Sequence, residues 1–332
     1  MKKVIKKIIT SQFPSILYLK RMRDYTRWIN NYKFDVSYEE SYRGVFEQMH
    51  KRAIKNQLSD SHASPPILIM TTYNDHDIIE SIIRENDKLG VEQIIIDNWS
   101  TDGTWSILEK LKDELHSVLN IIRYPFNGPT MQYCWKEMLD LKTDLSMSYK
   151  GRWIIHQDSD EVTLSPLYNF NLSETLKAIQ DLGYNCISLR MLDFVPIDDT
   201  FTIGNPLTHF EYYKISDIPS YSLQNKIWLQ GDDRVDLSCM GGHDVKFGNK
   251  MVFPIRLPRL HYSVRSVAHA NSKYSPKRLE RSESEREKLG WHTHIEKKSK
   301  EDVIHSKNDL IKFDFSDLYN TKFIWFINNE EN

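Results

Sequence analysis

Apolar residues in the first half of the chain occur in two kinds of pattern. Short continuous runs at Ile67–Met70 and Ile94–Ile96 have the length of buried strands. Between them, apolar residues recur every three or four positions over 76–89, which is the spacing of a helix, and Gly90 provides a C-terminal stop. The same spacing begins again at Trp105, after the second run. The pattern therefore predicts a strand, a helix, a second strand and a second helix.

This order, with short connections, is typical of a parallel sheet covered by helices. A further core strand is predicted at Trp153–Ile155, and it leads directly into the polar segment 156–161. Parallel sheets bind ligands beyond the carboxyl ends of their strands. We therefore expect a site where three segments meet, namely 71–75, 97–103 and 156–161.

The pattern is less regular beyond residue 184. Strands are predicted at Ile187–Leu192 and at Met251–Tyr262, with an irregular aromatic loop between them. The fold class expected is α/β, with a mainly parallel Rossmann-like sheet flanked by helices and a mixed second half. The expected organisation has three parts, a helical N-terminal extension, a core and a charged helical C-terminal extension, with bounds 1–62, 63–270 and 271–332.

Composition places the chain among ordinary globular proteins. It has 332 residues, of which 40% are hydrophobic and 27% charged. A net charge of -2 and a pI of about 6.6 give no electrostatic basis for nucleic-acid binding. The cysteines Cys134, Cys186 and Cys239 are odd in number and far apart, which argues against a zinc site or a disulfide framework and favours a reducing compartment such as the cytoplasm.

The N-terminus is basic and amphipathic. No stretch approaches the roughly 18 consecutive apolar residues that a membrane-spanning helix needs. Val4, Ile5, Ile8 and Ile9 share one helical face, and lysines occupy the opposite face. Such a helix can lie among the headgroups of an anionic membrane, which would make the protein peripheral at the inner face of the plasma membrane. A leader helix docked on its own domain fits the same pattern, and both interpretations remain open.

Asp158 and Asp160 are the strongest candidates for chemistry. They are two residues apart at the end of an apolar strand, so their carboxylates repel each other until a hard divalent cation binds. Such a cation keeps coordination positions for phosphate oxygens and can stabilise a diphosphate leaving group. An isolated Asp-x-Asp triplet is weak evidence, because most such triplets serve as turns or caps.

Several ordered motifs surround this pair. They are Thr71–Asn74 after the first strand, IIIDNWSTDGT at 94–104, FNG at 126–128 and HQDSDE at 156–161. Together, over about residues 66–165, the chain resembles family 2 glycosyltransferases and their GT-A relatives, and in particular a bacterial subgroup with a DxDE-type motif. GGHDV at 241–245 and HYSVRS at 261–266 resemble that subgroup more loosely.

The resemblance implies a GT-A fold that is divided into a nucleotide-binding half at 63–165 and an acceptor half at 166–270. The implied reaction moves a sugar from a nucleotide-diphosphate donor to a hydroxyl of a glycan or lipid-linked acceptor, with inversion and with Mn²⁺ or Mg²⁺ as cofactor. The implied setting is bacterial surface polysaccharide synthesis.

The resemblance also implies roles for individual residues. Those expected at the nucleotide-sugar are Thr72, Tyr73, Asn74, Asp97, Asp102 and Asp158, with Arg265 at the diphosphate or at an anionic acceptor. For Asp102, a purely conformational role in an Asp-Gly turn is an equal alternative.

Asp160 is expected to bind the metal directly, while Asp158 approaches the ribose or a metal-bound water. Glu161 would orient the cluster. His261 is expected to complete the metal or phosphate site. In the family that the chain resembles, the general base is followed by a strand, and a histidine ends that strand. His243 is a rival for that role.

Asp244 is the expected general base, since GGHDV precedes that strand. The family's usual Glu-Asp pair is His243-Asp244 here, and this departure leaves Asp232, Asp233 and Asp236 as alternative bases.

Two other function classes fit parts of the pattern. A nucleotidyltransferase would carry a phosphate loop rich in Gly, Arg or Lys after the first strand, where this chain has TTYND at 71–75. A degenerate domain that only binds sugar or scaffolds an assembly would not need both Asp158 and Asp160.

Overall fold

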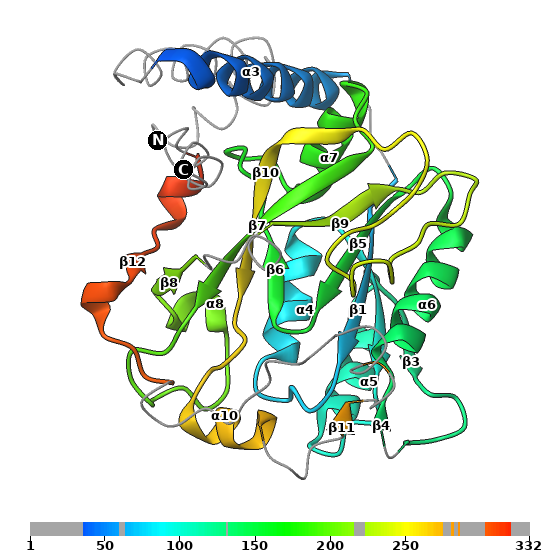
Figure 1. The fold of residues 1–332 in the computed structure, drawn as a ribbon, viewed down its shortest axis with the longest axis vertical. Coiled ribbons are helices and arrows are strands. Elements are labelled where there is room, and N and C mark those ends of the chain that lie inside the picture. Colours follow the sequence, from blue (N-terminus) through cyan, green and yellow to red (C-terminus); the bar gives the residue numbers. More distant parts are fainter. Residues whose placement is uncertain are drawn as a thin grey trace, which may run out of the picture.

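The structure is a computed structural model that describes residues 36–59, 64–130, 132–215, 223–274, 280–281, 285 and 303–319. Within these residues the chain forms a mixed α/β fold, in which helices flank one large curled sheet (Figure 1). The expected fold class is confirmed. The amphipathic pattern at the N-terminus lies outside the described residues.

The first half of the sheet is parallel. Its strands, in spatial order, are β5 (Trp153–Asp158), β1 (Ile67–Thr72), β2 (Glu92–Asp97) and β3 (Val118–Arg123). Strands β1, β2 and β5 contain the apolar runs that the sequence predicts. The expected parallel half is therefore present.

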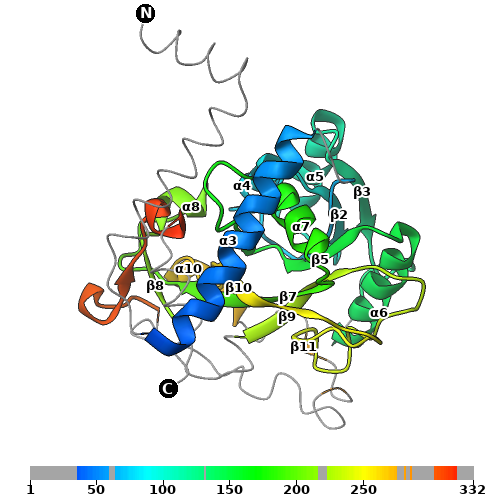
Figure 2. The ribbon, with the colours of Figure 1, turned by 90° about the horizontal axis from the view of Figure 1, so that it is seen from above.

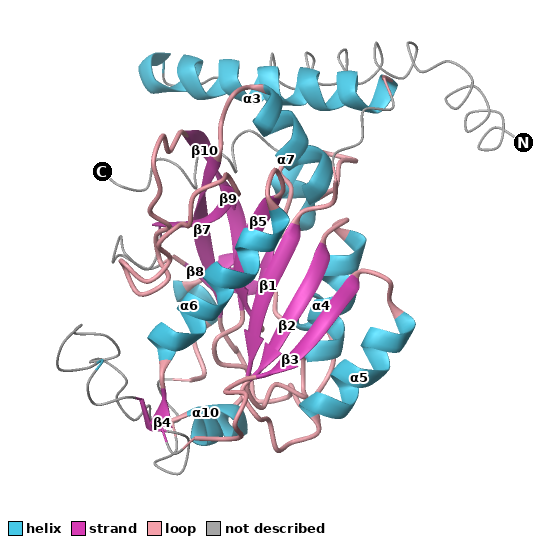
Figure 3. Ribbon diagram, turned by 90° about the vertical axis from the view of Figure 1, so that its right-hand side faces the viewer, coloured by secondary structure: helices cyan, strands magenta, loops and turns pink. Residues whose placement is uncertain are grey.

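Helices cover both faces of these strands (Figure 3). Helices α4 (Ile79–Lys88) and α5 (Thr104–Glu114) pack on one face, and α6 (Trp135–Ser146) packs on the other. Alternate strand residues divide between the faces: Leu68 and Met70 join the core with α4, whereas Ile67 and Ile69 join the core with α6. Two-sided burial explains why these strands read as continuous apolar runs.

The second half of the sheet is mixed, as expected. Its strands are β6 (Glu161–Thr163), β7 (Cys186–Phe194), β8 (Tyr212–Lys214), β9 (Leu223–Leu229) and β10 (Val252–His261). Strand β9 runs antiparallel to β5 and β7, and β10 runs parallel to β7 and antiparallel to β6. The strands predicted near 187–192 and 251–262 are confirmed. The segment between them is more regular than the expected loop, because it contains the short helix α8 (Pro206–His209) and the strands β8 and β9.

The N-terminal extension contains one described helix, α3 (Val36–Leu58), which lies at the end of the molecule opposite the carboxyl ends of the parallel strands (Figures 1 and 2). It packs on α7 (Leu172–Asp181), where Asn56 Nδ2 donates to Asp181 Oδ2 at 2.8 Å. Of the helices in the described ranges, none is long and apolar enough to cross a membrane.

The C-terminal extension was expected to be helical. Its described part begins inside α10 (Val267–Lys273) and contains the strands β11 (Glu280–Arg281) and β12 (Ile311–Lys312) and the 3-10 helices η2 (Lys307–Asp309) and η3 (Phe315–Tyr319). Strand β11 pairs with β4 (Gln132–Tyr133), and β12 pairs with β8. Outside this extension, one more 3-10 helix, η1 (Met147–Tyr149), follows α6 in the first half of the chain. The remaining residues of the extension lie outside the described ranges, so its helical character stays a prediction.

Candidate functional site

The carboxyl ends of β1, β2 and β5 meet at one edge of the sheet. In the strand register Thr72 is the partner of Asp97, and Thr71 is the partner of Asp158. Thr71 Oγ1 donates to Asp158 Oδ1 at 3.1 Å. The structure therefore brings together the three segments in which the sequence predicts a site.

The loops after β1 and β2 are tied to each other. Asn74 N donates to Ser100 Oγ at 2.9 Å, and Asn74 Oδ1 accepts from Thr101 N at 2.8 Å. Asn74 has a positive φ of 57°, a conformation that Asn adopts more readily than most residues. Asp102 accepts from the backbone of His76 and of Thr104, so its carboxylate holds this double loop and the start of α5.

Asp97 is turned into the protein. Its side chain is 0% exposed, it accepts from Ser100 N at 3.1 Å, and Arg123 Nε lies 3.7 Å from Oδ2. Burial raises the pKa of this carboxyl. The guanidinium of Arg123 stacks 4.3 Å from the Trp105 ring centroid. A direct contact between Asp97 and a nucleotide thus requires the loop at 98–101 to rearrange.

Glu161 helps to set the conformation of residues 158–161, called the DxDE segment, through contacts on the buried side of the segment. Its Oε1 lies 3.2 Å from Lys226 Nζ and its Oε2 lies 2.9 Å from Arg259 Nη1, all three side chains being buried. Burial opposes the charge of Glu161, but Lys226 and Arg259 outweigh it and lower the pKa of the carboxyl to about 2. Oε2 also accepts from Asp158 N at 3.2 Å. Glu161 therefore fixes the backbone of Asp158, in keeping with the orienting role expected of it.

Asp160 faces two cations. Lys273 Nζ lies 3.1 Å from Oδ2, and His261 Nε2 lies 3.8 Å from Oδ1. Burial opposes the charge, but Lys273 and His261 hold the pKa of Asp160 well below its usual range. For His261, burial acts against the charged form, yet Asp160 and Asp193 raise the pKa of the imidazole to about 9.

Asp160 and His261 are the side chains that could hold a metal ion here. His261 Nδ1 lies 2.6 Å from Asp193 Oδ1, which orients the ring so that Nε2 faces Asp160. One carboxylate and one imidazole, completed by phosphate oxygens and water, fit Mn²⁺ or Mg²⁺. Among the residues that the structure describes, no group of three His, Cys, Asp or Glu side chains converges on one metal position.

His243 and Asp244 reach the same edge of the sheet through β9. Ile227 of β9 is the partner of Ile155, so residue 225 lies beside the carboxyl end of β5. There Asn225 N donates to His243 O at 3.0 Å, and Asn225 Nδ2 donates to Asp244 Oδ1 at 2.9 Å. Burial lowers the pKa of His243 to about 4.

Asp244 is partly open, with a side chain 36% exposed. Lys250 Nζ donates to its Oδ1 at 2.7 Å, in addition to the bond from Asn225. Both donors contact the same oxygen, Oδ1, and so hold the carboxylate at the sheet edge where β5 ends with Asp158.

The structure does not bring Asp232 and Asp233 to that edge. Asp232 is 93% exposed and pairs at 3.2 Å with Lys150, which precedes β5, and Asp233 O accepts from Gln230 at 3.0 Å. The six residues of β5 separate the two ends by about 20 Å. The carboxylate of Asp236 accepts from Ser238 N and closes a local turn.

Gly242 seats the loop that carries His243 and Asp244. Its φ is +90°, and a Cβ there would lie 3.1 Å from His156 Nε2 and 3.1 Å from Leu139 Cδ2. Only glycine fits this close approach without strain.

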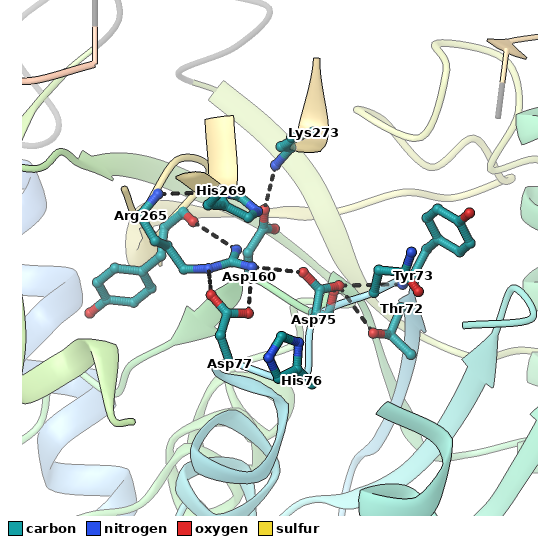
Figure 4. Close-up of polar contacts among 12 residues, drawn as sticks. Thr72, Tyr73, Asp75, His76, Asp77, Asp160, Arg265, His269 and Lys273 are labelled. Carbon is teal, nitrogen blue, oxygen red and sulfur yellow. Dashed lines mark hydrogen bonds and ion pairs between the residues drawn. The ribbon is translucent and has the colours of Figure 1, made fainter. Parts of the chain in front are cut away.

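Arg265 is fully buried and joins the loop after β1, residues 73–77 and called the donor loop under the proposed function, to the segment after β10 (Figure 4). Its Nε donates to Asp77 Oδ2 at 2.6 Å, and its Nη2 donates to Asp75 Oδ1 at 3.0 Å. Asp75 Oδ2 in turn accepts from Thr72 Oγ1 at 3.1 Å and from Ser159 Oγ at 2.6 Å. The guanidinium would have to give up one of these partners to meet a diphosphate.

Asp75 and Asp77 were not among the predicted site residues. The only sequence signal was the acidic pair in the YNDHD segment that follows β1. Their partner, Arg265, lies 190 and 188 residues further along the chain. Tyr73 follows Thr72 in the loop after β1, and its expected role at the nucleotide stays a prediction (Figure 4).

Comparisons with known proteins give a limited match. No family model matches the chain. A stretch of 129 residues is 28% identical to an uncharacterised glycosyltransferase of Mycoplasma genitalium, covering 36% of this chain and 41% of that protein. The match therefore spans about two fifths of the length of this curated relative.

Among solved structures, the chain is similar to a mannosyltransferase of Pyrobaculum calidifontis in complex with GDP-mannose and Mn²⁺. The sequence identity is 15%, the TM-score is 0.28, and 44% of each chain is covered. A TM-score this low carries no argument about shared geometry.

Proposed function

We propose that the chain is a GT-A-type glycosyltransferase that moves a sugar from a nucleotide-diphosphate donor to a hydroxyl of a glycan or lipid-linked acceptor. The observation that carries the proposal is the meeting of Thr72, Asp97 and Asp158 at one sheet edge, beside an Asp160 that faces His261. The partial similarity to a glycosyltransferase of Mycoplasma genitalium supports the same activity.

In this proposal, the donor site is built by the first half of the sheet. Asp160 and His261 would hold Mn²⁺ or Mg²⁺, with Asp158 at the ribose or a metal-bound water; the ion would supply positive charge to the departing nucleoside diphosphate. Asp193 orients His261, and Glu161 fixes the backbone of Asp158. Arg265 contributes indirectly, because it fixes the carboxylates that hold the donor loop.

The acceptor side of the proposal centres on Asp244. The acceptor oxygen would attack the anomeric carbon on the face opposite the diphosphate, and this direction of attack gives inversion. Asp244 would take the proton of the acceptor hydroxyl during the attack. Asn225 and Lys250 hold this carboxylate at the sheet edge. Asp244 is better placed to act as the base than Asp232 or Asp233, because it lies beside the carboxyl end of β5.

The setting belongs to the proposal as well. We infer bacterial surface polysaccharide synthesis, at the cytoplasmic face of the plasma membrane. Contact with anionic lipid would come from the basic segment at 1–30, and liposome flotation of a chain lacking it should show lost binding. Unchanged flotation would remove membrane contact from the proposal.

Nucleotide binding is the decisive experiment. Nucleoside diphosphates and nucleotide-sugars are screened by thermal shift with and without Mn²⁺. We expect one nucleoside diphosphate to raise the melting temperature in a Mn²⁺-dependent way, and Asp160→Ala to abolish the effect. If no nucleotide raises it under either condition, the transferase function is wrong.

The base is tested separately. In Asp244→Asn, sugar transfer should fall by about 100-fold or more, because the hydroxyl proton loses its acceptor, while the nucleotide-dependent thermal shift stays unchanged. Asp232→Asn serves as the matched control and should retain full activity. Wild-type transfer by Asp244→Asn would move the role to Asp236.

A further inference from the structure

Lys273 occupies an unusual place beside the DxDE segment. It is the last residue of α10, a helix whose first turn is capped by Ser266 Oγ, which accepts from His269 N at 3.0 Å. Its Nζ lies 3.1 Å from Asp160 Oδ2 and donates to Ser263 O at 2.6 Å. Figure 4 shows the ammonium pointing at the carboxylate. A helix end therefore holds a positive charge on the residue proposed to bind the metal.

The two oxygens of Asp160 are engaged by different groups. Oδ2 contacts Lys273, whereas Oδ1 faces His261 Nε2 at 3.8 Å. The Asp160 residue is only 8% exposed, so water screens the ammonium weakly. A divalent ion on the same carboxylate would lie within a few ångströms of that ammonium, and like charges at such a distance repel strongly.

Arg265 gives a useful contrast within the same cluster. Its guanidinium is matched by the carboxylates of Asp75 and Asp77, so its charge is balanced whether or not Asp160 binds a metal. The Lys273 side chain is 24% exposed and carries its charge on a flexible stem, so it can turn away from Asp160.

We propose that Lys273 is a built-in competitor for the divalent cation: its ammonium neutralises Asp160 in the metal-free protein and leaves the carboxylate when the metal binds. The inference rests on the proposed function, because it takes Asp160 as a metal ligand. Together with His261, Lys273 supplies positive charge to this nearly buried carboxylate while no metal is bound. The cost is a weakened affinity for the metal.

Mn²⁺ affinity tests this competition directly. The full-length chain is titrated with Mn²⁺ alone, without donor, in an isothermal calorimeter. In Lys273→Gln we expect the Kd for Mn²⁺ to fall by about tenfold or more, because the metal then displaces one positive charge fewer from Asp160. Lys88→Gln is the matched control, since Lys88 is an exposed residue that pairs with Glu85 of the same helix, and the Kd of this variant should equal that of the wild type. An unchanged or higher Kd in Lys273→Gln overturns the inference.

A second measurement needs no variant. Lysines of the wild-type chain are acetylated briefly, and the modified positions are quantified by mass spectrometry. Saturating Mn²⁺ should raise the labelling of Lys273 several-fold and leave Lys88 unchanged. Binding of Mn²⁺ without any rise at Lys273 contradicts the inference, as does an absence of Mn²⁺ binding in both the wild type and Lys273→Gln. Neither result removes the proposed transferase activity, which the nucleotide thermal shift tests independently.

Discussion

At the scale of single residues, Asp75 links the parts of the candidate site. One carboxylate contacts the donor loop through Thr72, the DxDE turn through Ser159 and the segment after β10 through Arg265. Because Arg265 is fully buried, its charge depends on carboxylate partners that are also removed from water. Asp75 therefore positions the site and stabilises the fold at the same time.

Replacing Asp75 tests this double role. We expect Asp75→Ala to lower the free energy of unfolding by about 1–3 kcal/mol, since Arg265 loses one of two carboxylates and Ser159 loses its acceptor. Urea denaturation measures the change. Asp232→Ala, which removes a solvent-exposed ion pair, should leave the unfolding midpoint unchanged. Equal midpoints in both variants would show that Asp75 stabilises nothing.

At the scale of elements, the position of the loop after Cys239 is fixed by its close contacts with α6 and β5. Trp135 Nε1 of α6 donates to Gly241 O at 2.8 Å, and Gly242 lies against His156 of β5. The next residues are His243 and Asp244. The packing of this loop therefore decides where the proposed base lies relative to Asp158.

Gly242→Ala should disturb that packing. The new Cβ meets two side chains at 3.1 Å and the residue keeps a φ of +90°, so we expect a loss of about 1–3 kcal/mol in stability and a lower rate of sugar transfer. Gly183→Ala is the matched control, because Gly183 has a φ of +91° with nothing within 4 Å of a new Cβ. The control should lose stability from backbone strain alone and keep its rate. A normal rate in Gly242→Ala would separate this loop from catalysis.

Some elements could be predicted from the sequence and others could not, for physical reasons. Strands β1, β2 and β5 are buried on both faces, so their apolar runs are continuous. Strand β3, with the sequence VLNIIR, is only partly buried and lacks such a run. Helix α6 was not predicted at all. Its start carries no local signal, because Trp135 N and Lys136 N donate to Glu285, which lies 150 and 149 residues away.

The site shows the same division. The edge formed by Thr72, Asp97 and Asp158 followed from strand ends alone, since parallel strands end on one side of a sheet. The anchoring of Arg265 by Asp75 did not, because that contact joins residues 190 positions apart and leaves no local pattern.

At the scale of the whole molecule, two basic groups, His261 and Lys142, give opposite contributions to the dependence of stability on pH. The pKa of His261 is raised to about 9 by Asp160 and Asp193 against the effect of burial. Its stabilising contribution is complete below its unfolded pKa of about 6.5 and is lost as the pH rises to 9. The pKa of Lys142 is lowered to about 7 by burial, so the folded chain holds a neutral amine where the unfolded chain holds an ammonium. Between pH 7 and 9 this second effect makes stability rise with pH.

Single substitutions should separate the two effects. In metal-free buffer the wild-type free energy of unfolding should change little between pH 7 and 9, because one proton is released and one is taken up. In His261→Gln only the Lys142 contribution remains, so stability should rise over this range by up to about 2 kcal/mol. In Lys142→Met it should fall by a similar amount. Urea denaturation at pH 7, 8 and 9 measures all three chains, and parallel pH profiles would mean that neither group changes its proton affinity on folding. In the proposed site Asp160 and His261 hold the metal together, so saturating Mn²⁺ should displace the proton from His261 and flatten the contribution of His261 to this pH dependence.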